Sequence, residues 1–258
     1  MAIGYEGHIK IAGAIALGTG GAGPKERVRL DSSSGYGGAV ASAVGLPHLY
    51  DWDVWEGSLD FEMTDGVFGT LSGWPAVRET TKSILISNRT SNSQTFDGYW
   101  TAISISAAAG AMTTGRLGFK ALERASYSYG SDNISKDGLG NASSALEPIP
   151  YWDTGIGAYK FIEWTLDLTQ DVVVFFACNA IAGPQAPAYL GMGPLNVSLS
   201  GSYIEDDEFS DFPGSLDVTV GGSSITLGSV ELQRTSDDLR TRNSLTPISV
   251  EFAAYELS

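Results

Sequence analysis

The sequence has few of the residues from which catalytic and metal sites are most often built. It contains one cysteine, Cys178, and two histidines, His8 and His48, in 258 residues. A single cysteine excludes a disulfide within the chain and a cysteine-based zinc site. The apolar neighbours of Cys178 indicate a buried side chain, and neither histidine has a partner at a metal-ligand or catalytic-triad spacing. We therefore expect no catalytic residue, no metal and no cofactor.

Basic residues and long apolar runs are also scarce. The chain has 15 Lys and Arg residues and 30 Asp and Glu residues, which gives a formal charge of −15 and a pI of about 4.4. The electrostatic field of such a negative chain repels a phosphate backbone, which argues against a protein that binds nucleic acids tightly. The longest apolar run, 172–178, is far shorter than the ~20 residues that span a bilayer. The first residues show no signal-peptide pattern, so we expect folding in a cytoplasm.

A glycine-rich string, Gly18-Thr-Gly-Gly-Ala-Gly23, matches the literal dinucleotide fingerprint. That fingerprint also needs a helix that opens at the glycines, so that its N-terminal amides meet the pyrophosphate. Pro24 and a charged segment follow here, with no apolar helical stripe. We interpret the string as a loop.

Most readable segments alternate apolar with polar residues, which is typical of half-buried strands. In 57–64 every second residue is apolar, with Asp60 and Glu62 between. The same alternation predicts strands over 100–106, 164–169, 195–203, 216–220 and 225–227. With 32 glycines and little helical periodicity, the chain is predicted to be all-β and antiparallel. Short helices are predicted over 75–82 and 236–242.

Six segments of the first half recur in the same order in the second, and their spacing changes only by loop-sized insertions. They pair 35–38 with 138–141, 46–47 with 149–150, 59–61 with 166–168, 84–87 with 195–198, 96–103 with 212–218, and 115–120 with 228–233. We predict a duplication: one β domain over 1–125, a linker over 126–137 and a second β domain over 138–258. A single larger sandwich is the alternative, because strands share a small vocabulary of residues.

The densest charge lies in the acidic run 205–211. It lacks the central glycine and alternating ligands of an EF-hand loop. A glycosidase needs two carboxylates at a defined distance in space, and the positions of these acids along one run do not reveal such a distance. We interpret it as a solvated hairpin tip. The six tryptophans are candidates for sugar platforms, but most alternate with polar residues inside strands, which favours core or interface positions.

The organisation of the whole chain resembles the tail tube proteins of tailed bacteriophages. The resemblance lies in the opening strand 3–11, the Gly/Ser loop 18–45, the Leu-Pro and Ile-Pro strand entries, and the segments 164–168 and 191–198. It implies a β-sandwich or half-barrel with one flanking helix for each tube domain. Six such domains would form a ring with a continuous inner barrel, and rings would stack into a tube. Two domains in one chain would suit a homotrimer with pseudo-hexameric symmetry.

A tube for DNA should not bind its cargo, and a lumen lined by carboxylates repels phosphates. The acidic residues expected to face the lumen are Asp60, Glu62, Asp167, Asp206, Asp207, Glu208, Asp211 and Asp217. The loop 18–45 is longer than a compact domain usually leaves without secondary structure, so we expect it to order on the next ring. The residues expected in this inter-ring contact are Gly18, Gly20, Gly23, Arg27, Arg29, Ser34 and Tyr36.

The resemblance also implies partners and a location. Copies of the chain would stack in the tail of a virion assembled in the host cytoplasm. Tail-tip and tail-terminator proteins would bind its ends, while the tape-measure protein and DNA would pass through without specific binding. A minor ring at the tail tip or neck would use the same domain. A carbohydrate-binding β-sandwich is the competing class, and a hydrolase with unpaired carboxylates is a third.

Overall fold

The computed structural model describes residues 8–12, 14–16, 31–32, 39–41, 47–49, 55–87, 92–121, 126–129, 148–175, 189–204, 214–236 and 247–257. These residues form a mostly β fold with antiparallel sheets and, within the described ranges, one short α-helix. The predicted all-β class is confirmed at this level. Among these ranges no helix has the length and apolar character needed to cross a bilayer.

The larger sheet has 12 strands and is built around long strands that cross the molecule. Its main path runs β16-β17-β13-β12-β8-β7-β1-β2, with β10, β9, β6 and β3 joined beside it. The bounds are β1 His8–Ile11, β2 Ala14–Ala16, β3 Asp31–Ser32, β6 Trp55–Glu62, β7 Lys82–Ser87, β8 Asn92–Ala108, β9 Thr114–Ala121, β10 Ser126–Tyr129, β12 Phe161–Phe175, β13 Tyr189–Ile204, β16 Glu231–Ser236 and β17 Pro247–Ala254.

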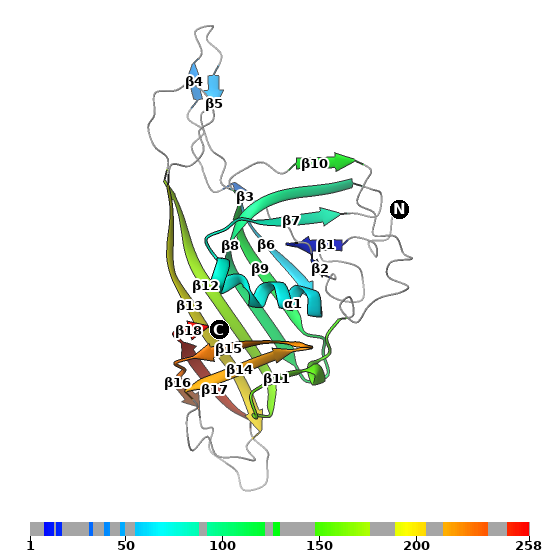
Figure 1. Ribbon diagram of the computed structural model, residues 1–258, viewed down its shortest axis with the longest axis vertical. Coiled ribbons are helices and arrows are strands. Elements are labelled where there is room, and N and C mark those ends of the chain that lie inside the picture. The colour runs from blue at the N-terminus through cyan, green and yellow to red at the C-terminus, as the bar shows by residue number, and fades with distance from the viewer. Residues whose placement is uncertain are drawn as a thin grey trace.

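A second, four-stranded sheet covers one face of the larger one. Its order is β11-β14-β15-β18, with bounds β11 Thr154–Ile156, β14 Ser215–Val220, β15 Ser223–Gly228 and β18 Glu256–Leu257. Helix α1, Asp65–Ser72, lies on the same face as this sheet (Figure 1). A separate hairpin pairs β4, Ala39–Ala41, with β5, Pro47–Leu49.

The core lies between the two sheets, because each long strand turns every second side chain toward the covered face. On β6 and β12 the buried residues include Leu59, Phe61, Leu166 and Leu168. They belong to one cluster with the inner residues of β14 and β15 and with α1. The strands predicted over 57–64, 100–106, 164–169 and 195–203, and the 216–227 hairpin, are confirmed.

The helix prediction over 75–82 was wrong. That segment holds a single 3-10 turn, η1 (Trp74–Val77), and β7 begins at Lys82. The helix lies just before it, where the Thr64 hydroxyl accepts a hydrogen bond from the Val67 amide at 3.4 Å and caps α1. Pro75 does start a helical turn, but only a short one. Ser236 ends β16, and 237–242 of the second predicted helix lie outside the described residues.

Residues from both predicted domains share one sheet and one core. Strand β8 of 1–125 pairs with β12 of 138–258 from Ala102↔Thr169 to Ala108↔Glu163. The strands matched in the sequence repeat have different partners: 84–87 lies in β7, beside β1 and β8, whereas 195–198 lies in β13, beside β12 and β17. The matching of 84–87 with 195–198 was therefore wrong, and the division into tandem domains stays a prediction.

Candidate functional surface

The face of the larger sheet that points away from α1 and the small sheet is the candidate functional surface. We call it the polar face and define it by two rows of residues that cross β6, β9, β8, β12, β13 and β17. The first row is Glu62, Thr114, Ser106, Thr165, Ser200 and Glu251. The second row is Asp60, Arg116, Ser104, Asp167, Ser198 and Ala253.

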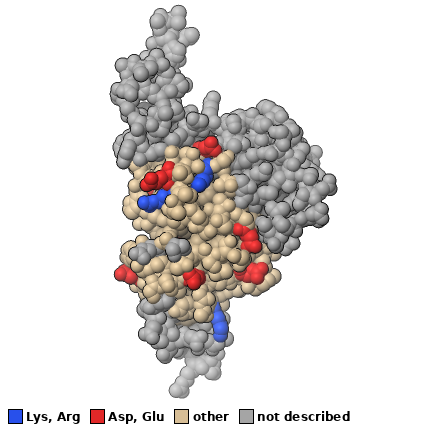
Figure 2. Space-filling view, viewed as in Figure 1, with Lys and Arg blue, Asp and Glu red and all other residues tan. Residues whose placement is uncertain are grey.

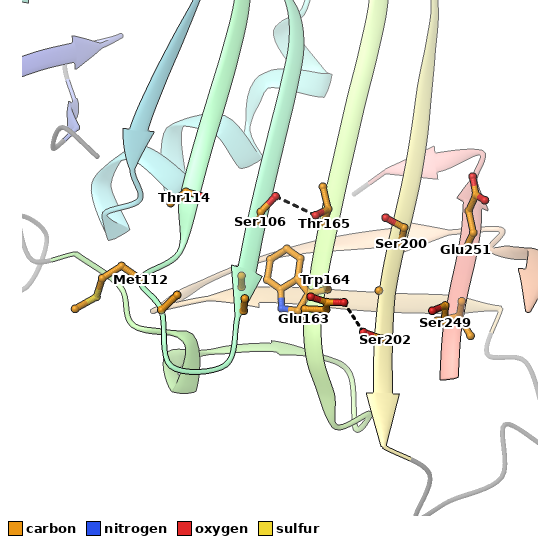
Figure 3. A pocket seen from close by; sticks show the side chains of 15 residues that line it. Ser106, Met112, Thr114, Glu163, Trp164, Thr165, Ser200, Ser202, Ser249 and Glu251 are labelled. Carbon is orange, nitrogen blue, oxygen red and sulfur yellow. Dashed lines mark hydrogen bonds between the residues drawn. The ribbon is translucent and has the colours of Figure 1, made fainter. Parts of the chain in front are cut away.

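The polar face follows directly from strand alternation. Most of its residues stand between buried apolar neighbours, as Asp167 does between Leu166 and Leu168. The side chains are short apart from the acids and Arg116, so the face is low and hydroxyl-rich. Figure 3 views part of this surface, with Ser106, Thr165, Ser200 and Glu251 on adjacent strands.

Hydrogen bonds join side chains across the strands of this surface. The hydroxyls of Ser106 and Thr165 are 2.9 Å apart, and the Ser202 hydroxyl donates to Glu163 Oε1 at 2.7 Å (Figure 3). Cross-strand pairs of this kind help to fix the register of a sheet. A shallow hollow of about 580 Å³ opens here across β8, β12, β13 and β17.

The two rows carry a negative charge. They hold four carboxylates, from Asp60, Glu62, Asp167 and Glu251, and one guanidinium, from Arg116. Arg116 Nε lies 3.7 Å from Asp60 Oδ1, and its Nη2 donates to the Ser58 hydroxyl at 3.2 Å. Both charged side chains are substantially exposed, so this pair contributes little to stability. The pair does keep the Arg116 guanidinium beside the carboxylate of Asp60.

The structure brings three of the predicted acidic residues together. Asp60, Glu62 and Asp167 lie on the polar face, with Asp60 and Asp167 in the same row. Asp217 lies apart from them, on β14 of the small sheet, where it is exposed and its Oδ1 accepts a hydrogen bond from the Thr226 hydroxyl at 2.6 Å. Asp206, Asp207, Glu208 and Asp211 lie outside the described residues.

The predicted inter-ring loop cannot be placed on this surface. All seven of its named residues lie outside the described ranges: Gly18, Gly20, Gly23, Arg27, Arg29, Ser34 and Tyr36. The same holds for Cys178, whereas His8 and His48 fall in β1 and β5. In the described part of the chain, no three His, Cys, Asp or Glu residues are grouped as a metal site would require.

Sequence reasoning missed Glu163 and Glu251, which lie at this hollow. Glu251 stands between buried Val250 and Phe252, so the alternation of 247–254 was a usable signal. Glu163 precedes the buried Trp164 at a bulge in β12, where strict alternation fails.

The opposite side of the molecule has a different character. Figure 2 shows the face that carries α1 and the small sheet, and on its described part acidic and basic side chains form small separate patches. Of the tryptophans, Trp74, Trp100 and Trp164 are buried, as expected for core residues, and Trp152 is 74% exposed.

Comparison with known proteins adds no relative to this picture. No protein-family model matches the chain, and a search of the curated proteins found no match.

Proposed function

We propose that this chain is a tail tube subunit of a tailed bacteriophage, and that the polar face lines a conduit through which DNA passes. The observation that carries the proposal is a broad antiparallel sheet with one face on the core and the other covered by hydroxyls and carboxylates. A solvated polar face is common in antiparallel sheets, so the proposal depends on the width of this face over six strands and on its net negative charge.

The chemistry of the polar face suits passage without binding. Phosphates are repelled by Asp60, Glu62, Asp167 and Glu251, and Arg116 lies beside Asp60. The remaining positions are six short hydroxyl side chains and Ala253, which present no aromatic or broad apolar surface on which bases could stack. DNA would therefore slide along this face rather than pause on it.

The order of strands supports the finer proposal of two tube-like repeats. One line of paired strands runs β3-β6-β9-β8 and then β12-β13-β17-β16, with β7, β1 and β2 branching from β8. Within each group of four, the strands follow one another along the chain in the same way: first the first strand of the line, then the second, then the fourth and last the third. The first group falls in 1–125 and the second in 138–258, so each proposed repeat supplies four strands with the same connectivity.

This order also supports the proposed trimer. Eight strands from each of three chains would make a barrel of about 24 strands, and barrel diameter grows with strand number until a wide channel remains. Closing the ring would also remove exposed sheet edges. Three chains with two repeats each would form the pseudo-hexameric ring. Rings would stack in the virion tail, with tip and terminator proteins at the ends and tape-measure protein and DNA inside.

A carbohydrate-binding module is the second candidate. Three of its possible platforms, Trp74, Trp100 and Trp164, are buried, but Trp152 remains open to solvent. Such a module would act as a monomer and would bind glycans saturably.

Negative-stain microscopy of the purified protein at high concentration, with sedimentation beside it, tests the proposal. We expect hollow rings or tubes with a pore that admits a DNA duplex, assembled from trimers. A stable monomer that never assembles would contradict it, and saturable binding to a glycan array would then support the carbohydrate-binding module.

A further inference from the structure

Strands β12 and β13 continue beyond the sandwich as a two-stranded arm. The last pair between β12 and β8 is Thr169↔Ala102, and the pairing of β13 with β17 begins only at Val197. Beyond these points Val172–Phe175 pairs with Tyr189–Met192. We call these eight residues the arm, and Figure 1 shows β12 and β13 rising together past the body of the sandwich.

The arm belongs to the longest stretch of the sequence without a charged residue. No Asp, Glu, Lys, Arg or His occurs between Asp171 and Glu205. In a chain with 17% charged residues and a net charge of −15, this stretch is exceptional. The arm itself consists of Val172, Val173, Val174, Phe175, Tyr189, Leu190, Gly191 and Met192.

The two faces of the arm differ in their burial. Val172 is 2% exposed, and its carbonyl accepts a hydrogen bond from Lys120 Nζ at 3.1 Å, which ties the base of the arm to β9. The next residue, Val173, points the other way and is 48% exposed. A two-stranded ribbon is marginal in water on its own, and Val173 leaves an apolar side chain half-open on this one.

We infer that the Val173 face of the arm binds a second copy of this chain. Copies that each carry −15 repel one another wherever carboxylates face carboxylates. The eight residues of the arm carry no carboxylate, so two acidic copies can meet on the arm beyond the exposed Asp171 without opposing charges. An uncharged contact core is typical of interfaces between subunits. This inference rests on the self-assembly proposed above, because it names the surface through which the subunits join.

The test compares Val173→Asp with a matched variant, Val77→Asp. Val77 is 41% exposed and lies in η1, so the second variant adds the same charge at an equally open valine outside the arm. We expect Val173→Asp to raise the protein concentration needed for half-assembly by at least about tenfold, because a carboxylate would be buried in each contact. Val77→Asp should assemble like the wild type. Thermal unfolding and circular dichroism of both variants check that each subunit stays folded.

The outcomes separate this inference from the proposed function. Hollow rings from both the wild type and Val173→Asp at equal concentrations would overturn the arm contact and leave the tube proposal standing. Assemblies that depend on Val173 but enclose no pore would support the contact and contradict the tube. A wild-type protein that stays monomeric at every concentration would overturn both. If Val173→Asp is unfolded, Val173→Thr replaces it, with a smaller shift in the same direction expected.

Discussion

The carboxylate of Asp65 accepts a hydrogen bond from the backbone amide of Gly222 at 3.1 Å and so joins the two layers of the fold. Asp65 opens helix α1, and Gly222 lies in the turn between β14 and β15. On its other side this turn is held by the Gly221 amide, which donates to the Asp153 carbonyl at 2.8 Å. The contact positions the small sheet over the core.

Replacing Asp65 with alanine should therefore loosen the small sheet. We expect Asp65→Ala to lower the free energy of unfolding by about 0.5–1.5 kcal/mol, since one hydrogen bond and one favourable charge at a helix N-terminus are lost. Asp65→Asn keeps the acceptor oxygen and should cost less. Urea unfolding measures both, with Glu79→Ala as a control at an exposed acid. Equal effects from Asp65→Ala and Glu79→Ala would refute this role.

Gly221 and Gly222 should respond very differently to alanine. Gly221 has φ +58°, and a Cβ there would collide with the Asp65 carboxylate. The nearest atom to a Cβ at Gly222 is Asp65 Oδ2, at 3.9 Å. We expect Gly221→Ala to cost about 2 kcal/mol or more and Gly222→Ala less than about 1 kcal/mol. Thermal unfolding of the two variants tests this difference. Equal melting temperatures would contradict it and would mean that the turn adapts freely.

The shared core predicts that both halves unfold together. Leu117 on β9 and Leu166 on β12 are fully buried in the same cluster. We expect Leu117→Ala and Leu166→Ala each to cost about 2–5 kcal/mol and to shift one common transition. Tryptophan fluorescence and circular dichroism recorded during urea unfolding provide the test. Two transitions, each moved by only one of the variants, would show that the halves are independent units.

Alkaline pH should destabilise the fold through its tyrosines. Burial raises the pKa of Tyr99 and of Tyr151 above the usual value of 10.0. The folded state therefore keeps these protons to higher pH than the unfolded state does. The contribution of these two tyrosines to the free energy of unfolding is fully present below about pH 10. It is lost as the pH rises through their raised pKa in the folded state. The double variant Tyr99→Phe with Tyr151→Phe should flatten the loss of urea stability between about pH 9 and 11, whereas Tyr255→Phe, at an exposed tyrosine, should not.

Charge reversal on the polar face should make assembled protein retain DNA. We expect assemblies of the double variant Asp167→Lys with Glu251→Lys to pellet together with a short DNA duplex at low salt. Asp217→Lys with Glu79→Lys makes the same change of charge at two exposed acids outside the rows of the polar face. That variant should retain less DNA. Equal retention by both variants would show that net charge alone, rather than the polar face, controls contact with DNA.

Much of the sheet was predictable, because alternation along a strand is a local property. The segments of β6, β12 and β13 each bury every second residue, and the sequence shows that pattern without knowledge of their partners. Helix α1 was missed because Gly66 and Gly69 interrupt a short segment and weaken its helical signal. The cap at Thr64 and the burial of the helix against the core compensate for this weak helix propensity.

The composition of the candidate surface was harder to predict. Asp60 and Asp217 occupy equivalent places in alternating segments, yet they lie on different sheets. Which sheet a strand joins depends on pairing between distant residues, and no local pattern records it. For the same reason the repeat matched β8 with β14, although β14 belongs to the covering layer.

The most direct test of the account is a cryo-electron microscopy reconstruction of the assembled protein, at a resolution that places the strands. We predict a ring or tube whose inner wall is formed by β3, β6, β9, β8, β12, β13, β17 and β16, with Asp60 and Asp167 facing the pore and Asp217 on the outside. A tube whose outer wall carries Asp60 and Asp167 would contradict the account, as would an assembly without a pore.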